Sequence, residues 1–580
     1  MDRSLDFGDD EVDRYMQNNI NLNHEGTKTL RKNHLRAFES PWFYRVLLWL
    51  APILFLLAYF FLPLSKILIL AFNISALTKT NFQLIFTTLS FTFYQAALST
   101  ALTFILGIPS AILFSRFNFR GKSLLRALTA VPFMLPTVVV ASSFNALFGD
   151  HGLFSSSIIP HPSSFSLILS AHVFYNTTIV IRIVGNALSR LDPKLEQSAR
   201  SLGADTFRVW KNITLPLLRP SLLAAALLVF MFDFTSFGVI LLLGGSNFST
   251  LEVEIYLRVL KIPNLPLAAL LSIVQLIFTL IFSILYTRTI SQVTTQTNPR
   301  FSTSRPPKSI RERIFVFTVY CSLFTFFLLP LLSLPIRSLT RLEADRGQRG
   351  EVQYGFTTDY YKELFVNRRG SLFYVSPIQA AANSLGYASL TVILSLALGY
   401  PAAYALAKPT RLEKFLDPLI MLPLGASAVM LGLGFIISFG RSLASPWFVP
   451  IAHTLVALPF VIRTLQPALA SIPERLRQAA STLGASPFRV WQTVDFPILS
   501  RATLSAATFA FTVSLGEFGA TLLLTRPEYP TIPIAIQRFL SQPGGLNFGQ
   551  AMAMATLLML LTTFAILIIE KLRLPNSGEF

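Results

Sequence analysis

The chain has 580 residues, of which 52% are hydrophobic and only 13% are charged. One water-soluble core cannot bury this much apolar surface, so the composition excludes an ordinary soluble protein and indicates a membrane protein. The formal net charge of +19 does not indicate a nucleic-acid binder, because the basic residues lie in short connections between apolar runs and not on a soluble domain.

Twelve long apolar runs follow one another along the chain, and each approaches or exceeds the roughly 20 residues that a helix needs to cross the hydrocarbon layer. They predict an all-α integral membrane protein with about 12 transmembrane helices. The approximate spans are 44–72, 88–115, 124–148, 165–188, 213–243, 263–288, 313–336, 379–407, 414–439, 447–469, 494–525 and 547–571.

Polar segments divide these spans into two membrane units. Residues 1–43 are polar and contain no cleavable signal pattern, which predicts a disordered cytoplasmic tail. Residues 289–312 are rich in Ser, Thr, Pro and Arg and predict a cytoplasmic linker. We therefore expect a first repeat of six helices over 44–288, a second over 313–572, and a short C-terminal tail over 573–580.

Basic residues indicate which connections face the cytoplasm. They gather in the connections at 116–126, 300–313 and 408–414. The connections at 73–87 and 149–164 hold Lys79 alone. This positive-inside bias predicts that both termini are cytoplasmic. The long segment 337–378 mixes basic and acidic residues on the expected outer side, where long loops cross regardless of charge.

The chain repeats itself. A shift of 281 positions aligns residues 171–243 with 452–524 without a gap, and Phe237-Gly238 then falls on Phe518-Gly519. A copy with an even number of spans inserts in the same orientation, so the halves are parallel repeats related by an axis along the membrane normal. The seam between them is the natural pathway for a transported solute.

The most strongly repeated stretch is polar: SLGADTFRVW in the first half recurs as TLGASPFRVW in the second. A short helix in each copy ends at Gly203 or Gly484, because glycine favours the left-handed conformation of a helix stop. Asp205 and Ser486 follow as N-caps of a second helix. The two short helices project on the cytoplasmic side, where they either pack on their own membrane domain or insert into a partner. Phe207 fits either role.

Around this stretch the sequence resembles the signature loop of ABC importer permeases. The first copy reads Gln-Ser-Ala-x-x-x-Gly followed by Ile-x-Leu-Pro, and the second begins Gln-Ala-Ala-x-x-x-Gly. In that family the loop is the coupling helix that docks into a cleft of an ATPase subunit, and its first residue is usually glutamate where both copies here have glutamine. The resemblance assigns coupling to Gln197, Ser198, Ala199, Gly203, Ala204, Phe207, Arg208, Gln478, Ala479, Ala480, Gly484, Ala485, Phe488 and Arg489.

The chain has no phosphate-binding loop of its own. The nearest approach, Gly121-Lys122-Ser123, lacks the earlier glycine and lies in a basic connection. The resemblance therefore implies two separate ATPase subunits, one per loop, which hold ATP and Mg. It also implies an extracytoplasmic solute-binding protein.

This chain is then expected to be a channel-forming subunit and no enzyme. We expect it to bind no cofactor or metal, to contact membrane lipid, and to bind no nucleic acid. The implied location is the bacterial or archaeal plasma membrane, crossed many times.

Polar residues inside apolar spans are costly and indicate a pathway. The fifth span of each half holds such residues just before the repeated Phe-Gly pair. The pathway candidates are Asp233, Ser236, Ser514 and Glu517. Asp233 and Glu517 either line the cavity or gate, or they bond to neighbouring helices or lie at the interface. Gly238 and Gly519 permit close helix packing.

His172 and His453 occupy matching positions near the outer ends of the fourth spans. Two histidines facing each other across a seam suggest a metal, but two ligands do not complete a site, and no cysteine or carboxylate cluster joins them. Structural hydrogen bonding is the favoured interpretation.

The resemblance also narrows the cargo. Fused double permeases of this length resemble thiamine and ferric-iron importers, and the runs at 234–256 and 514–536 are similar to the thiamine type. We therefore expect the permease subunit of a binding-protein-dependent ABC importer for a small solute of the thiamine or ferric-iron class. The alternative is an ion-coupled secondary transporter with two homologous halves, which does not require duplicated docking loops.

Overall fold

The computed structural model describes residues 41–72, 78–149, 151–154, 162–245, 248–294, 304–342, 355–366 and 375–572. Ten helices in this part of the chain are long and apolar enough to cross a membrane, and two further pairs of helices pass the same test together but are bent. The prediction of an all-α membrane protein with about 12 spans is therefore confirmed. The expected tails over 1–43 and 573–580 and the centre of the expected linker lie outside the described residues, apart from 41–43.

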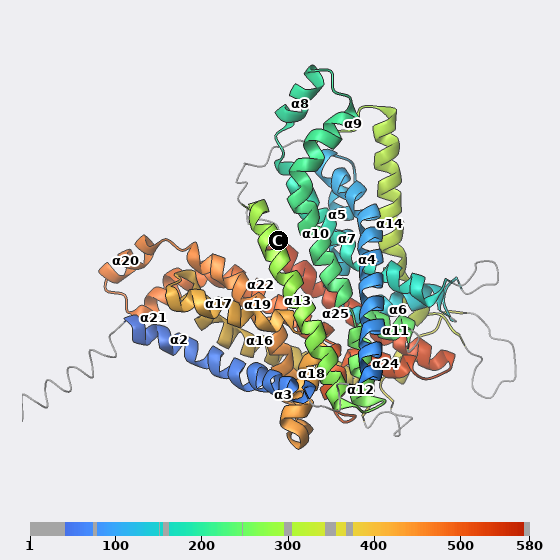
Figure 1. Ribbon diagram of the computed structural model, residues 1–580, viewed down its shortest axis with the longest axis vertical. Helices are drawn as coiled ribbons and strands as arrows, with labels where there is room; N and C mark the ends of the chain where they lie inside the picture. The colour runs from blue at the N-terminus through green and yellow to red at the C-terminus, as the bar shows by residue number, and fades with distance from the viewer. Residues whose placement is uncertain are drawn as a thin grey trace, which may run out of the picture.

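The first half of the chain folds into the helices that Figure 1 draws from blue to green. In order they are α2 (Pro41–Leu56), the π-helical turn η1 (Leu57–Phe61), α3 (Leu62–Ala71), α4 (Lys79–Arg116), α5 (Lys122–Met134), α6 (Thr137–Phe148), α7 (Ser164–Arg190), α8 (Pro193–Ser201), α9 (Thr206–Val209), the π-helical turn η3 (Trp210–Thr214), α10 (Leu215–Phe234), α11 (Gly238–Gly244), α12 (Leu251–Leu260) and α13 (Leu265–Thr294).

The second half repeats this order. Its elements are α14 (Ile310–Ser338), α15 (Asp359–Glu363), α16 (Gln379–Ala407), α17 (Arg411–Gly425), α18 (Ala428–Phe439), the 3-10 turn η4 (Gly440–Ala444), α19 (Phe448–Ala470), α20 (Glu474–Thr482), α21 (Pro487–Val490), the π-helical turn η5 (Trp491–Asp495), α22 (Phe496–Gly516), α23 (Gly519–Leu524), α24 (Ile532–Leu540) and α25 (Gly545–Leu572).

The expected spans 124–148 and 414–439 each correspond to a bent pair of helices. The chain bends by 111° between α5 and α6 and by 97° between α17 and α18. Leu135 is extended, as the residue before a proline prefers, and Pro136 then precedes α6. In the second half the Ser427 hydroxyl accepts a hydrogen bond from the Met430 amide and starts α18 anew.

The expected spans 213–243 and 494–525 are also interrupted. α10 ends at Phe234 and α11 begins at Gly238, while α22 ends at Gly516 and α23 begins at Gly519. Both breaks fall just before or within the repeated Phe-Gly pair, so the apolar run continues although the helix does not. Hydropathy alone could not reveal these breaks, because both sides of each break are equally apolar.

The first helix of each half packs partly on the opposite half. α2 lies against α16 and α3 against α18, whereas α14 lies against α5 and α6. Each also contacts the last helix of its own half, α3 on α13 and α14 on α25. Trp49 of α2 donates a hydrogen bond to Glu413 of α17 over 3.5 Å. The two halves therefore pack against each other through their first helices. The repeat boundaries expected from the sequence stay a prediction.

Close helix crossings hold each half together at a glycine. A Cβ atom on Gly107 of α4 would lie 2.7 Å from Val180 of α7, and one on Gly399 of α16 would lie 2.7 Å from Val461 of α19. Small residues at such crossings let helix backbones approach within a membrane, where association depends on packing. The repeat is thus preserved as a pair of equivalent contacts.

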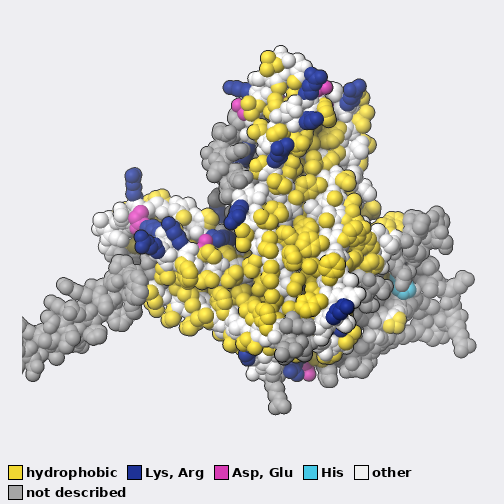
Figure 2. All heavy atoms as spheres, in the orientation of Figure 1, with side chains coloured by type: hydrophobic (Ala, Val, Ile, Leu, Met, Phe, Trp, Pro, Cys, Tyr) yellow, Lys and Arg dark blue, Asp and Glu magenta, His cyan; other side chains and the backbone are white. Residues whose placement is uncertain are grey.

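Two arms diverge from a shared base in Figure 1. The upright arm ends in α8 and α9, and the other arm ends in α20 and α21. Figure 2 shows lysine and arginine side chains around both ends, while hydrophobic side chains cover the flanks. Apolar flanks are what a lipid-facing surface requires.

Enlarging the crossing glycine tests this packing. Gly399→Leu forces α16 and α19 apart, so we expect a loss of about 1–3 kcal/mol of stability, as for other overpacked contacts. The measurement is the midpoint of thermal unfolding of the detergent-purified chain.

Gly386→Leu on the same helix is the matched control, because nothing lies within 4 Å of a Cβ atom at Gly386. We expect that change to be neutral or slightly stabilising, since it removes a glycine from a helix. Equal effects of the two changes would contradict the crossing.

Candidate docking loops and central seam

The two repeated loops have the same backbone. Gly203 and Gly484 adopt positive φ values of 86° and 82°, and the Ala204 and Ala485 amides donate to the carbonyls of Ala199 and Ala480 over 3.0 and 3.1 Å. This is the Schellman arrangement, in which a left-handed glycine closes a helix. The prediction of a helix stop at both glycines is confirmed.

The second helix of each loop begins at a side-chain cap. The Asp205 carboxylate accepts a hydrogen bond from the Arg208 amide over 2.8 Å, and the Ser486 hydroxyl accepts one from the Arg489 amide over 3.4 Å. Both predicted N-caps are confirmed. The caps stabilise the turn locally, so the side chains on the outer face of the loop are not needed to hold it.

We call residues 202–208 and 483–489 the tips. Large apolar side chains are exposed on both: Leu202 and Leu483 by 89% and 87%, Phe207 and Phe488 by 73% and 71%. Exposed apolar side chains at matching places indicate an interaction surface. The inward-facing residue of each tip region is instead a valine, Val209 or Val490, which is buried.

The other predicted coupling residues lie on or beside the tips. Exposed positions are Gln197, Ser198, Gly203, Arg208, Gln478, Ala479, Gly484 and Arg489. Half-buried positions are Ala199, Ala204, Ala480 and Ala485. Their role in coupling stays a prediction, but all are placed on the two projecting loops.

A polar brace holds the base of each loop, and the sequence analysis did not find it. In the first copy Glu196 pairs with Arg116 of α4 and accepts a hydrogen bond from Thr214 over 3.1 Å. In the second copy Arg477, which occupies the position of Glu196, donates to Asp495 over 2.8 Å. Asp495 occupies the position of Thr214, so the contact is preserved, but a Glu–Thr hydrogen bond in the first copy is an Arg–Asp ion pair in the second.

The braces shift the titration of their acidic members. Burial raises the pKa of Glu196, but the hydrogen bonds and charge of Arg116, with Thr214, outweigh it and leave the pKa below its ordinary value. The hydrogen bond from Lys408 lowers the pKa of Glu474 beside Arg477. These carboxylates therefore stay ionised near neutral pH and keep the loops anchored.

Inside the first half, one histidine gathers a buried polar cluster that we call the first node (Ser99, His172, Asn176, Asp233 and Ser236). His172 Nδ1 lies 3.1 Å from the Ser99 hydroxyl and 3.6 Å from Asp233, and Nε2 lies 2.8 Å from the Ser236 hydroxyl. Asn176 donates to Asp233 over 2.7 Å. The first node ties α4, α7 and α10 together at the break in the fifth span.

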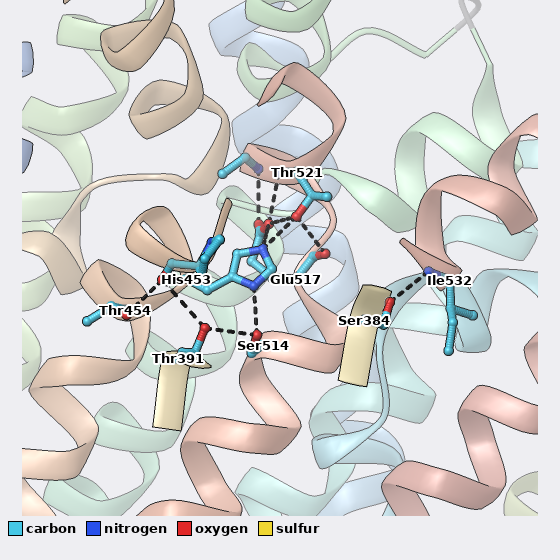
Figure 3. A network of polar contacts seen from close by, with 10 residues as sticks. Ser384, Thr391, His453, Thr454, Ser514, Glu517, Thr521 and Ile532 are labelled. Carbon is cyan, nitrogen blue, oxygen red and sulfur yellow. Dashed lines mark hydrogen bonds and ion pairs between the residues drawn. The ribbon is translucent and has the colours of Figure 1, made fainter. Parts of the chain in front are cut away.

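Figure 3 shows the equivalent second node (Thr391, His453, Ser514, Glu517 and Thr521). His453 Nδ1 lies 2.7 Å from the Ser514 hydroxyl, and Nε2 lies 2.7 Å from the Thr521 hydroxyl and 3.4 Å from Glu517. The Glu517 carboxylate also accepts hydrogen bonds from the amides of Ala520 and Thr521, over 3.0 and 2.9 Å. Glu517 thus begins α23.

The acid and the serine exchange places between the nodes. Each histidine meets two positions of the fifth span, three residues apart: Asp233 and Ser236 in the first half, Ser514 and Glu517 in the second. These four residues are the pathway candidates. Asp233, Ser514 and Glu517 are buried and Ser236 is half-buried, so they bond to neighbouring helices here. Their place in a pathway stays a prediction.

Both histidines bond within their own half, so the hydrogen-bonding interpretation is confirmed. Among the described residues no three His, Cys, Asp or Glu side chains come together in a way that could hold a metal ion. The histidines therefore serve here as connectors of helices.

The seam between the halves is closed by two equivalent phenylalanines, which the sequence analysis did not single out. Phe237 and Phe518 stack with ring centroids 5.6 Å apart and an interplanar angle of 26°. Since they occupy the same position in the two copies, the pseudo-symmetry axis passes between them. Cβ atoms on Gly238 and Gly519 would lie 2.5 Å from Thr137 and 3.0 Å from Ala428, so both glycines permit the expected close packing.

Comparisons with known proteins agree with this architecture. The family model described as "Binding-protein-dependent transport system inner membrane component" matches residues 103–295 and 395–573, one match in each half. The thiamine transport system permease protein ThiP of Brucella abortus (strain 2308) is 27% identical over 84% of this chain and 88% of its own length. ThiP of Escherichia coli K12 is 26% identical over 83% of this chain and 88% of its own length.

Removing the Glu517 carboxylate tests the second node. Glu517→Ala leaves the buried amides of Ala520 and Thr521 without an acceptor, so we expect a loss of about 1–3 kcal/mol of stability. Glu517→Gln keeps one acceptor oxygen and is expected to cost less. Thermal unfolding in detergent measures both, and a neutral Glu517→Ala would show that the carboxylate does not support the break.

Proposed function

The chain belongs to the family of binding-protein-dependent transport system inner membrane components, and we propose that its two tips receive two copies of one ATPase. It is the permease subunit of an ABC importer, a transport subunit that spans the membrane many times. The family implies a solute-binding protein and ATPase partners. The single observation that carries the proposal is the pair of tips with matching exposed residues.

The tips support a single kind of ATPase because their outer faces agree while their bases differ. Leu202, Phe207 and Arg208 have the same residue types at the matching positions of the second tip, and these side chains are exposed in both copies. The braces below them use different residue types and charges. A surface kept alike on two otherwise divergent loops fits two identical clefts.

Tip and seam are ends of one helix, which gives the coupling a mechanical path. One spanning helix runs from Thr206 to Phe234 and its counterpart runs from Phe488 to Gly516, each 29 residues long. At about 1.5 Å per residue each rod is roughly 43 Å long. A tip that moves with its ATPase therefore displaces the polar node and the adjoining phenylalanine at the other end.

The proposed cycle follows from this linkage. ATP and Mg bound between the partner subunits bring the two tips together, and the rods rock the halves about the seam. Parting of Phe237 from Phe518 opens the pathway toward the solute-binding protein. By reciprocity, docking of the loaded solute-binding protein favours the ATPase arrangement that goes with that opening.

The orientation of the chain supports the same assignment. The tips and the connections rich in Lys and Arg belong on one side by the positive-inside bias, which makes that side and both termini cytoplasmic. The expected host membrane is the bacterial or archaeal plasma membrane. No residue of this chain is assigned to a cofactor or to a metal.

We propose thiamine as the cargo, because the relatives named above are thiamine transport permeases that cover most of the chain. Ferric ion is the rival that the sequence resemblance left open. Importers of both solutes use a solute-binding protein, so that requirement does not distinguish them. Uptake of each labelled solute by cells does.

Charge placed on the tips tests the docking. Leu202→Asp with Phe207→Asp, and separately Leu483→Asp with Phe488→Asp, are expected to lower the amount of ATPase that copurifies by about tenfold or more, as for residues that dominate an interface. Ile262→Asp is the control, because Ile262 is 60% exposed but lies in the turn after α12, away from both tips. Unchanged copurification in both tip variants would contradict the docking.

Uptake of labelled solutes tests the cargo. Cells that express the chain are expected to accumulate labelled thiamine faster than cells that lack it, and to take up labelled ferric ion equally with or without it. Chain-dependent uptake of ferric ion but not of thiamine would reverse the assignment.

A further inference from the structure

Glu252, in the first turn of α12, is a buried carboxylate that the coupling scheme does not use. Its side chain is 1% exposed. One carboxylate oxygen accepts a hydrogen bond from the Gln275 amide group of α13, and the Ser427 hydroxyl acts on the carboxylate as a further hydrogen-bond donor. The Gln275 amide oxygen has no hydrogen-bond partner among the described residues. The charge that acts on Glu252 is the like charge of Glu517, and a buried carboxylate without a positive partner is costly, so this place lacks a positive charge.

The electrostatic surroundings of Glu252 further disfavour its negative charge. Burial raises the pKa of Glu252 to about 8, with a further rise from the charge of Glu517. Hydrogen bonds from Gln275 and from the Ser427 hydroxyl lower this pKa in part. Glu517 and Ser427 both belong to the second half, so Glu252 faces a like charge across the seam.

Glu254, two residues further along α12, is a carboxylate that has a positively charged partner. It accepts hydrogen bonds from Arg258 over 2.7 Å and from the Ser249 hydroxyl over 2.9 Å. Its charge therefore has a partner on the same helix. Two acids of one short helix are treated in opposite ways, and the unsatisfied one faces the seam.

Aromatic rings meet at the same part of the seam. Tyr256 follows Glu252 by one helical turn and therefore lies on the same side of α12. Its ring centroid is 5.6 Å from that of Phe237, which stacks on Phe518 across the halves. Phe518 directly follows Glu517. The three rings therefore form a continuous contact across the halves, and the two carboxylates, which act on each other electrostatically, belong to the same two chain segments.

This cluster breaks the two-fold pattern of the molecule. The position of Glu252 is occupied by Pro533 in the second half, and the position of Glu517 is occupied by Ser236 in the first. Each half therefore contributes one acid from a different element. Such a site suits a single ligand that has no symmetry of its own.

We propose that Glu252 and Glu517, with the rings of Phe237, Tyr256 and Phe518, form a binding site at the seam for an aromatic organic cation in transit. The site rests on the proposed function, because it assigns residues to the cargo of that permease. Carboxylates neutralise a positive charge strongly where water is excluded, and aromatic faces bind organic cations and stack on flat rings. The thiazolium ring of thiamine is such a cation.

The closed seam explains why the site is unsatisfied in this conformation. Phe237 and Phe518 occupy each other's faces, and Glu252 is left beside another acid. When the halves part, the rings separate and a cation entering between them supplies the charge that Glu252 lacks. The free-energy cost of burying Glu252 without a positive partner in the closed state thereby favours opening when a positively charged cargo binds.

The test compares a cation with its neutral isostere in proteoliposomes that contain the whole complex. The probes are labelled thiamine and the analogue whose thiazolium ring is replaced by a neutral thiophene ring. We expect Glu252→Gln to lower the ratio of thiamine uptake to analogue uptake by about tenfold or more, because truncating a desolvated charge partner has effects of that size. Glu254→Gln is the matched control and is expected to leave the ratio unchanged.

Two further measurements keep the outcomes distinct. Glu252→Asp retains the charge and is expected to keep most of the ratio, which separates loss of charge from damage to the fold. ATP hydrolysis stimulated by the solute-binding protein reports whether each variant is still coupled. A coupled Glu252→Gln complex with an unchanged ratio would overturn the site while leaving thiamine as the cargo. Absence of thiamine uptake by the unaltered complex would instead reject the cargo and this site with it.

Discussion

The break in the fifth span of each half determines how the polar nodes and the seam are arranged. Backbone groups freed inside a membrane need partners from the protein, because lipid offers none. The first half satisfies its break with Gln95, which donates to the Asp233 carbonyl over 2.7 Å, and with the His172 cluster. The second half uses the Glu517 carboxylate as the acceptor for the amides that begin α23. The first role of the polar nodes is therefore to supply hydrogen-bond partners to the backbone groups that the helix break leaves free.

In the proposed cycle, the same break also allows gating. A helix that stops at Phe234 or Gly516 lets the next short helix turn toward the axis, and this brings Phe237 and Phe518 face to face. The other end of the same rod is a docking tip with exposed leucine and phenylalanine side chains. Force applied at the tip reaches the seam through a single helix, and the glycine crossings of α4 with α7 and of α16 with α19 keep each half rigid while it moves. In the proposed cycle, coupling and gating therefore depend on the same helix.

The sequence allows prediction of those features that depend on a few neighbouring residues. The glycine stops and N-caps of the loops depend on backbone conformation within a few residues, so Gly203, Asp205 and their copies could be placed beforehand. The spans followed from apolar length. The breaks could not be found in this way, because hydropathy continues across them, and neither could the contact of Glu196 with Arg116, which are 80 positions apart. The Phe237–Phe518 stack had a visible signal in the repeated Phe-Gly pair, but its meaning required knowing that the two copies meet at that position.

The central claim is that both tips lie in the cytoplasm and hold the same partner. The most direct measurement is photocrosslinking in intact cells from a light-activated amino acid placed at Leu202 or at Leu483, followed by identification of the captured protein. We expect both positions to capture the same ATPase polypeptide and neither to be reached by membrane-impermeant reagents from outside. Capture of this chain alone from both positions, or labelling of the tips from the cell exterior, would contradict it.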